Sequence, residues 1–168
     1  VAAGLGSSAL VDGLDLYATK GEILRLAANS WSVPPPRHVV RARLDGRSVY
    51  LVPRKDGIVV GATQYESGRD TQVTVAGVRD LIADAETLMP AIGEYELAET
   101  IAGLRPMTPD NLPLIGRLTD RVVVATGHGR NGILLAPITV DAVLALLDGT
   151  SVVEAKSADP ERFSGASA

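Results

Sequence analysis

Arg105 is the side chain in this sequence that is best placed to bind an anion. It closes an apolar segment and is followed by Pro106, so we predict a guanidinium held stiffly at the end of a strand. Its planar fork of N–H donors matches the two oxygens of a carboxylate. Most single arginines are solvated or structural, and position alone leaves that alternative open.

Tyr50 lies within another short apolar segment, where its hydroxyl would point to one face of a strand. A buried tyrosine needs a hydrogen-bond partner, which would give Tyr50 a polar role. Packing in the core is the simpler interpretation.

A glycine-rich turn offers a second kind of binding group. Gly127, Gly129 and Gly132 stand between a mostly apolar strand segment and an apolar helix. Free backbone N–H groups at the start of that helix would make an electropositive site for an anionic group. Glycines also allow a flat ligand to approach the backbone closely. An ordinary turn between a strand and a helix explains the same residues.

Few side chains are candidates for acid–base or metal chemistry. His128 could titrate near neutral pH, but it has no evident partner in the sequence, and Asp110 is most simply a turn residue. With no cysteine and only two histidines, the sequence predicts no disulfide, no thiolate nucleophile and no metal site. We therefore name no catalytic side chain.

Residues 4–9, GLGSSA, fit the G-x-G-x-x-A pattern of dinucleotide-binding folds. Only three residues precede the pattern, and Glu22, at a passable distance, falls at the start of a different element. We predict a corner between a strand and a helix rather than a phosphate-binding loop.

The elements that position these residues are predicted from local patterns. Asp45-Gly46 and Asp56-Gly57 separate apolar segments and indicate hairpins of an antiparallel meander. Helical spacing from 75 to 89, with Thr74 as N-cap and Pro90 at the end, predicts a covering helix. The strands of this lobe are expected at 24–26, 39–44, 49–53, 58–62 and 94–104.

The second part of the sequence alternates between strand and helix signals. We predict a loop over 105–117, a strand buried on both faces over 121–126, and a helix over 133–147. The tail after Gly149 is expected to fray. The fold class is α+β, with an antiparallel or mixed sheet covered by a helix and a fragment of an α/β nucleotide-binding domain.

The composition argues against some classes of binding partner. The net charge of −4 is spread out and aromatic residues make up 4%, so neither a phosphate-binding stripe nor a base-stacking platform is expected, and no nucleic-acid partner. Pro137 and Asp141 interrupt the most apolar stretch, which argues against a membrane span. The absence of cysteine fits a cytoplasmic protein. The chain lacks an initial methionine, so we expect a piece of a longer protein.

Two long motifs resemble a known family. Residues 103–110 and 112–116, GLRPMTPD and LPLIG, resemble the D-amino acid oxidase superfamily of FAD-dependent oxidoreductases, and residues 125–137, ATGHGRNGILLAP, resemble its glycine oxidase (ThiO-type) branch of thiamine biosynthesis. Residues 20–22, 50–54 and 60–63 also match the substrate-binding lobe of that family, and 159–163 its C-terminal ending.

The resemblance implies roles for particular residues. Arg105 matches an arginine that pairs with the substrate carboxylate, and Tyr50 a tyrosine that hydrogen-bonds the same group. Arg130 matches a residue that lies against the flavin ring of FAD and shapes the substrate site. The implied cofactor-binding residues are Gly103, Gly127, His128, Gly129, Arg130, Asn131, Gly132 and Ile133.

The resemblance also implies the reaction: oxidative deamination of glycine or a small amino acid, with release of hydrogen peroxide. The implied domains are 1–17 and 105–150 from an FAD-binding domain, 18–104 as the substrate-binding lobe, and 151–168 as a tail. The upstream Rossmann half has no counterpart, so we predict that the isolated chain is inactive, binds FAD weakly or not at all, and self-associates through uncovered sheet edges. A D-amino acid dehydrogenase, a sarcosine oxidase-like enzyme and a non-catalytic binding or assembly module are the alternatives.

Overall fold

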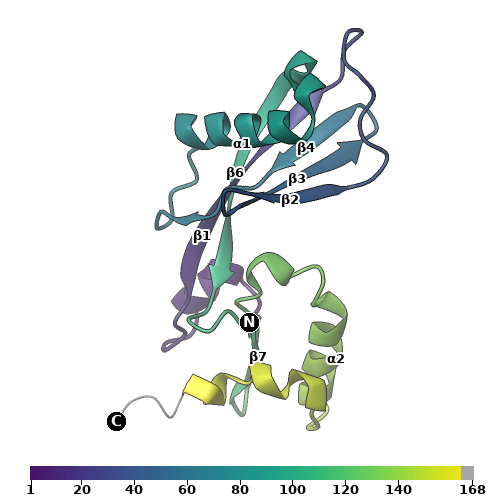
Figure 1. Cartoon of the computed structure of the whole chain (residues 1–168). Helices are drawn as coiled ribbons and strands as arrows, with labels where there is room; N and C mark the ends of the chain where they lie inside the picture. Colours follow the sequence, from purple (N-terminus) through teal and green to yellow (C-terminus); the bar gives the residue numbers. More distant parts are fainter. Residues whose placement is uncertain (164–168) are drawn as a thin grey trace. The chain divides into compact units, whose positions relative to one another are not determined.

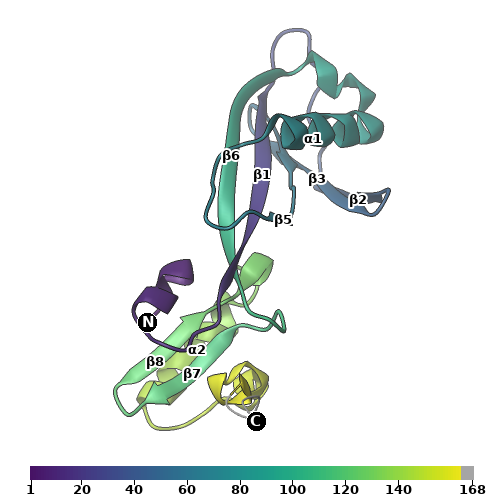
Figure 2. The same cartoon turned by 90° about the vertical axis from the view of Figure 1, so that its left-hand side faces the viewer.

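The computed structural model describes residues 1–163, which form two compact units. Unit 1 comprises Val1–Thr19 and the described residues from Arg105 onward, and unit 2 comprises Lys20–Leu104. Figures 1 and 2 show the elements of each unit from two directions. Each unit is described by itself.

Unit 2 is built on an antiparallel sheet with the strand order β2-β3-β4-β1-β5, and β6 also pairs with β1. Asp45 and Gly46 both have positive φ angles, 47° and 83°, which is the geometry of the two-residue hairpin that Asp-Gly predicts. The strands are β1 (Tyr17–Ala27), β2 (Val40–Leu44), β3 (Arg47–Arg54), β4 (Gly57–Gly61), β5 (Tyr65–Glu66) and β6 (Glu96–Met107).

Helix α1 (Val75–Leu88) lies across one face of this sheet (Figure 1). Thr74 is its N-cap, since the Thr74 hydroxyl accepts a 3.0 Å hydrogen bond from the Gly77 amide. The apolar side of α1 packs on the inward side chains of the central strands, including Leu51 and Val60. The predicted helix, its cap and the antiparallel meander are confirmed.

Two strands of unit 2 extend beyond their predicted limits. The prediction for 24–26 covered only the end of β1, and β6 continues through Arg105 to Met107, where a loop was expected. Because β1 and β6 pair with each other, their hydrogen bonds continue past the apolar residues that marked them in the sequence. Arg105 therefore lies inside a strand rather than at its end.

Unit 1 contains a two-stranded antiparallel sheet, β7 (Leu114–Thr119) and β8 (Val122–Thr126), and helix α2 (Ala136–Leu147). The prediction of a loop over 105–117 was wrong at both ends, because the observed loop covers only 108–113. Strand β8 was expected to be buried on both faces, but only two of its residues, Val124 and Thr126, are fully buried. Residues 4–9 form a 3-10 helix.

The tail after Gly149 is ordered through residue 163, against the prediction of fraying. It forms two 3-10 helices, Val153–Ala158 and Pro160–Phe163. Ala158 packs with Ile115 and Ala142 in the core of unit 1, and a methyl group added to Gly116 would lie 2.3 Å from Pro160. This close packing, which the Ser- and Ala-rich composition does not reveal, orders the segment. Residues 164–168 lie outside the described part of the chain.

An ion pair fastens this tail to the loop before β7. The Arg162 guanidinium donates to both carboxylate oxygens of Asp110, at 2.6 and 3.1 Å. Asp110 also accepts hydrogen bonds from Thr108 and from the Leu112 amide, so its predicted role in a turn is confirmed. Arg162, with burial opposing it, holds the pKa of the Asp110 carboxyl well below its ordinary value.

Replacing Asp110 by asparagine is expected to destabilise the chain by about 1 to 2 kcal/mol at neutral pH, because the charge-assisted bonds are partly exposed. A lowered carboxyl pKa contributes stability above the ordinary value of 3.8 that is lost as the pH falls through the folded value. Urea unfolding at pH 7 and pH 3 measures this. Asp80→Asn, which removes an exposed pair with Arg79, is the control. An effect of Asp110→Asn that is unchanged in acid would contradict the ion-pair explanation.

Among residues 1–163, no helix combines the length and the apolar character needed to cross a membrane.

Candidate functional site

Arg105 carries the clearest mark of a binding group. Its side chain is partly buried, and the Nη1 atom is fully buried without a hydrogen-bond partner among the described residues. A buried guanidinium nitrogen without an acceptor costs free energy, and such atoms are rare in folded proteins. A carboxylate bound here would supply the missing acceptor. An anionic ligand would therefore suit Arg105, in agreement with the role that its position in the sequence suggested.

Tyr50 lies on β3 in unit 2, opposite Gly61 of β4. Its ring covers the Gly61 α-carbon so closely that a methyl group built there would lie 2.4 Å from the Tyr50 hydroxyl oxygen. The ring is thus fixed in place by a glycine that leaves room for it. Tyr50 is partly buried, and the described residues give its hydroxyl no hydrogen-bond partner. That hydroxyl is available to a ligand.

The glycine-rich turn after β8 differs from its prediction. Gly127 and Gly129 have φ angles of 72° and 55°, a region that side chains other than glycine rarely adopt. A methyl group at either position would also clash with the protein, at 2.7 Å from Thr108 and 2.6 Å from Met107. Packing and backbone geometry therefore explain these two glycines. Only Gly132, where a methyl group would make an ordinary contact, leaves space for a ligand.

Helix α2 begins at Ala136, not at Ile133 as predicted. Residues 129–131 form a 3-10 turn, and the Leu135 amide donates to the Asn131 carbonyl, so part of the backbone expected to face a ligand bonds internally. No side chain caps the helix. Arg130 and Asn131 are exposed, and Ile133 is 95% exposed. The segment from 128 to 135 presents a turn with polar and apolar side chains on its surface.

His128 has a partner that the sequence did not reveal. Its Nε2 atom lies 3.0 Å from the Thr139 hydroxyl, which is placed to donate at 2.7 Å to the Leu135 carbonyl. Because the hydroxyl proton is used there, the geometry favours the tautomer in which Nε2 carries the imidazole proton and donates to Thr139. Burial lowers the pKa of His128. His128 therefore connects the glycine-rich turn to Thr139 in the first turn of α2.

The His128 ring is expected to remain neutral, with the proton on Nε2, at a pH where the same ring is largely protonated in the urea-unfolded chain. Nitrogen-15 NMR of the imidazole, which distinguishes the two ring nitrogens, measures both the tautomer and the pKa. Thr139→Val should remove the preference for Nε2. The exposed His38 provides a control signal that this variant should leave unchanged. An Nδ1 proton in the folded chain would contradict the assignment.

The other predicted cofactor residue, Gly103, lies in unit 2 on β6, whereas Gly127 to Ile133 belong to unit 1. A methyl group at Gly103 would meet no described atom within 4 Å. Arg105 and Tyr50 likewise belong to different units. The assignment of these residues to one site stays a prediction.

The sequence reasoning missed a buried charged cluster in unit 2. Lys20 and Glu22 on β1 are 1% and 0% exposed. The Lys20 ammonium donates to Asp70 at 2.7 Å and to the Gln72 carbonyl at 2.8 Å, and it lies 3.9 Å from Glu22. Glu22 accepts a 2.8 Å hydrogen bond from the Thr74 amide at the start of α1. The Lys-Gly-Glu motif was the available signal, since two charges two residues apart share one face of a strand.

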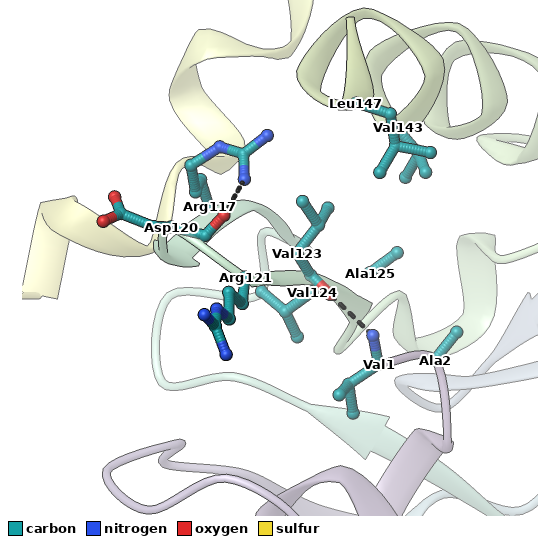
Figure 3. Close-up of a pocket in the computed structure, with 10 residues that line it drawn as sticks. All are labelled: Val1, Ala2, Arg117, Asp120, Arg121, Val123, Val124, Ala125, Val143 and Leu147. Atoms are coloured by element: carbon teal, nitrogen blue, oxygen red, sulfur yellow. Dashed lines mark hydrogen bonds between the residues drawn. The ribbon is translucent and has the colours of Figure 1, made fainter. Parts of the chain in front are cut away.

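A hollow of about 610 Å³ in unit 1 lies beside β8 and α2 (Figure 3). The Val1 ammonium donates to the Val123 carbonyl at 2.5 Å, and the Ala125 amide donates to the Val1 carbonyl, so the chain start follows the strand edge. The Arg117 guanidinium donates hydrogen bonds to the carbonyls of Asp120 and Leu146. Aliphatic side chains make up most of the lining, and none of the predicted site residues contributes to it. It suits packing better than the binding of a carboxylate.

Comparison with known proteins defines the class of the chain. The family model described as FAD dependent oxidoreductase (DAO) matches residues 1–146. The chain belongs to this family of FAD-dependent oxidoreductases. The expected fold class is also confirmed, because the mixed α and β structure with antiparallel sheets is similar to solved members of that fold. Among the described residues, no group of three side chains is arranged to hold a metal ion.

Within this family, the chain is similar to proteins named glycine oxidase and ThiO. The chain is 41% identical over 151 residues to the bifunctional protein ThiO/ThiG of Nostoc sp., covering 88% of this chain and 22% of that protein. It is 37% identical over 159 residues to glycine oxidase of Bacillus licheniformis, covering 90% and 41%. The crystal structure of glycine oxidase from Geobacillus kaustophilus matches with a TM-score of 0.75 at 34% identity, covering 89% and 39%. The chain thus spans less than half the length of these relatives.

Proposed function

We propose that this chain is the part of an FAD-dependent amino acid oxidase that binds the substrate carboxylate, with glycine as the substrate and thiamine biosynthesis as the pathway. The buried, unpartnered Nη1 atom of Arg105 supports this most directly. The similarity to proteins named glycine oxidase and ThiO supports the choice of glycine. Membership of the family of FAD-dependent oxidoreductases, over residues 1–146, agrees with this function.

FAD, when bound, supplies a two-electron acceptor that takes hydride from the substrate α-carbon and returns the electrons to O₂ as hydrogen peroxide. The chain's own residues bind and orient the substrate. The Arg105 fork takes the carboxylate. The Tyr50 hydroxyl, which has no partner in its own unit, is a further candidate donor to a ligand. Arg130 and the backbone from His128 to Ile133 would hold the flavin. Water hydrolyses the imino acid to glyoxylate and ammonia, so glycine, O₂ and water give glyoxylate, ammonia and hydrogen peroxide.

No side chain of the described residues is assigned as an acid or base. An amino acid that binds with a neutral amine needs no base to release its α-hydrogen as hydride. His128, whose Nε2 atom contacts the Thr139 hydroxyl, is assigned to holding the turn in place and not to proton transfer. The protein then contributes by positioning the substrate. Holding the reacting atoms within contact distance accounts for a large increase in reaction rate.

The complete gene product that contains this chain provides the test. Glycine added without oxygen should bleach the flavin, and oxygen should restore the colour with formation of hydrogen peroxide. A flavin that glycine does not bleach would overturn the glycine assignment. Bleaching by D-amino acids with slow reaction toward oxygen would instead identify a dehydrogenase, and bleaching by sarcosine with fast reaction toward oxygen a sarcosine oxidase-like enzyme.

The isolated chain is expected to bind FAD weakly or not at all and to lack oxidase activity. The physical reason is that the chain spans only 41% of the glycine oxidase it resembles, and we expect the residues that bind the rest of a large cofactor to lie outside it. Titration with FAD, followed by fluorescence and a peroxide assay with glycine, measures this. A yellow and active preparation of the isolated chain would contradict it. A folded chain with a protein partner and no flavin would favour a binding or assembly module.

A further inference from the structure

The end of strand β4 connects the buried charged cluster of unit 2 with Tyr50. Gly61, the last residue of β4, pairs with Ile23 of β1 on one side and with Tyr50 of β3 on the other. Two residues later, the Thr63 side chain contacts Glu22. The proposed function uses Tyr50 and assigns nothing to Thr63 or Glu22. The backbone from 61 to 63 therefore joins a candidate ligand donor to a buried carboxylate.

Thr63 and Glu22 are joined by three hydrogen bonds. The Thr63 hydroxyl oxygen accepts from the Glu22 amide at 2.8 Å, and the hydroxyl is placed to donate to a Glu22 carboxylate oxygen at 3.3 Å. The Thr63 amide donates to the Glu22 carbonyl at 3.2 Å. This last bond is one residue out of the register that pairs Ile23 with Gly61, so the chain carries an extra residue just after β4. Irregularities of this kind bend a strand and re-aim the side chains beside it.

Glu22 has a fixed position of its own. Its side chain is fully buried, and its carboxylate also accepts a 2.8 Å hydrogen bond from the Thr74 amide, where α1 begins. The Lys20 ammonium lies 3.9 Å from the same carboxylate. Moving a buried carboxylate away from its partners leaves polar groups unsatisfied, which costs free energy. Glu22 therefore holds Thr63, and with it the end of β4, in one position.

The position of the β4 end decides where the Tyr50 hydroxyl lies. The Tyr50 ring packs over the Gly61 α-carbon, and a methyl group built there would lie 2.5 Å from the ring carbon that carries the hydroxyl. No described residue hydrogen-bonds this hydroxyl, so packing on the β4 backbone determines its place. Hydrogen bonds weaken steeply when the donor is misaligned. A shift of the backbone at Gly61 would therefore weaken a bond from Tyr50 to a ligand.

We propose that Thr63 is a positioning residue for substrate binding: held by Glu22, it fixes the end of β4 on which the Tyr50 ring packs, and so sets the direction in which the hydroxyl donates to the substrate carboxylate. The inference rests on the proposed function, in which Tyr50 is a candidate donor to the ligand. Thr63 itself does not touch the substrate. Its loss should weaken substrate binding and leave the reaction of the bound substrate nearly unchanged. A role in the fold alone would lower the amount of folded enzyme and leave KM as it was.

Steady-state kinetics of the complete gene product tests the proposal. Thr63→Val keeps the shape of the side chain and removes the hydroxyl, so KM for glycine should rise about 5- to 10-fold, the effect of one hydrogen bond to the ligand. The value of kcat should stay within about twofold. Thr63→Ser keeps the hydroxyl and should restore most of the affinity. Thr87→Val, at an exposed threonine whose hydroxyl donates to the Ala83 carbonyl within α1, is the matched control.

A double-mutant cycle with Tyr50→Phe makes the test specific. Tyr50→Phe alone should raise KM by a similar factor. In that background Thr63→Val should add less than about twofold, because the hydroxyl that Thr63 positions is already absent. Gly61→Ala displaces the same ring without removing the Glu22 contact, so it should behave as Thr63→Val does and provides the cycle if that variant folds poorly. Gly93→Ala, where a methyl group would meet only the Glu86 carboxylate at 3.2 Å, is its control.

The outcomes separate the positioning role from the proposed function. A normal KM in Thr63→Val, when Tyr50→Phe raises it, would overturn the positioning role and leave the proposed function intact. Equal effects of Thr63→Val with and without the Tyr50 hydroxyl would do the same. A KM that neither variant changes would remove both the positioning role and Tyr50 as a donor, and the assignment of Arg105 to the carboxylate would then depend on its own substitution.

Discussion

Replacing Arg105 by methionine in the complete gene product is expected to lower kcat/KM for glycine about 100-fold or more, the effect of roughly 3 kcal/mol of lost binding to a buried charge. Methionine keeps much of the side-chain length and removes the donors. Most of the loss should appear as a higher KM, because the carboxylate contact is made with the substrate as well as in the transition state. Steady-state oxygen consumption at varied glycine concentration measures it.

Arg105→Lys separates the charge from the geometry of the fork. Lysine keeps the positive charge but cannot form two parallel hydrogen bonds, so kcat/KM should recover only in part. Arg79→Met, which removes an exposed arginine of α1, is the matched control and should leave kcat/KM unchanged. An Arg105→Met enzyme with normal KM for glycine would show that the buried Nη1 atom serves the structure, and the carboxylate assignment would fail.

Features set by local sequence were predicted correctly. The Asp45-Gly46 hairpin follows from two adjacent residues that tolerate positive φ angles. The start of α1 follows from Thr74, whose hydroxyl accepts a hydrogen bond from the amide three residues later, that of Gly77. Neither feature requires contacts with residues distant in the sequence. The ends of β1 and β6 were missed because a strand ends where its partner stops pairing, and that partner lies about 80 residues away in the chain.

The candidate site shows the same division. The arginine and the glycine-rich turn were predicted as site residues because their residue types carry the chemistry, and that assignment stays a prediction. The His128 contact with Thr139 and the packing of Gly129 on Met107 were missed, since each joins residues whose spacing has meaning only once the chain is folded. The order of residues 150–163 was missed for that reason too: the segment is polar and small, yet it is fixed by contacts with Gly116 and Asp110.

Glu22→Ala is expected to destabilise the chain by about 3 kcal/mol, because it leaves the Thr74 amide without its acceptor and removes the buried carboxylate nearest to Lys20, whose ammonium keeps Asp70 as its partner. Glu22 is fully buried, and its carboxylate oxygen would lie 1.6 Å from a methyl group at Gly77, so the first turn of α1 is built directly around it. Urea unfolding of the chain, followed by circular dichroism, measures the loss. Glu66→Gln, an exposed glutamate on β5, should have little effect.

The pH dependence of Glu22→Gln shows whether charge is the cause. Burial opposes ionisation of Glu22, but hydrogen bonds from Tyr65 and Thr74 and the nearby Lys20 outweigh it and lower its pKa. A lowered carboxyl pKa gives stability that is complete above the ordinary value of 4.5 and is lost as the pH falls through the folded value. The stability difference between the parent chain and Glu22→Gln should therefore be largest near neutral pH and should shrink in acid. A difference that stays constant from pH 7 to pH 3 would mean that Glu22 acts through shape and hydrogen bonding, and that the buried charge contributes nothing to the fold.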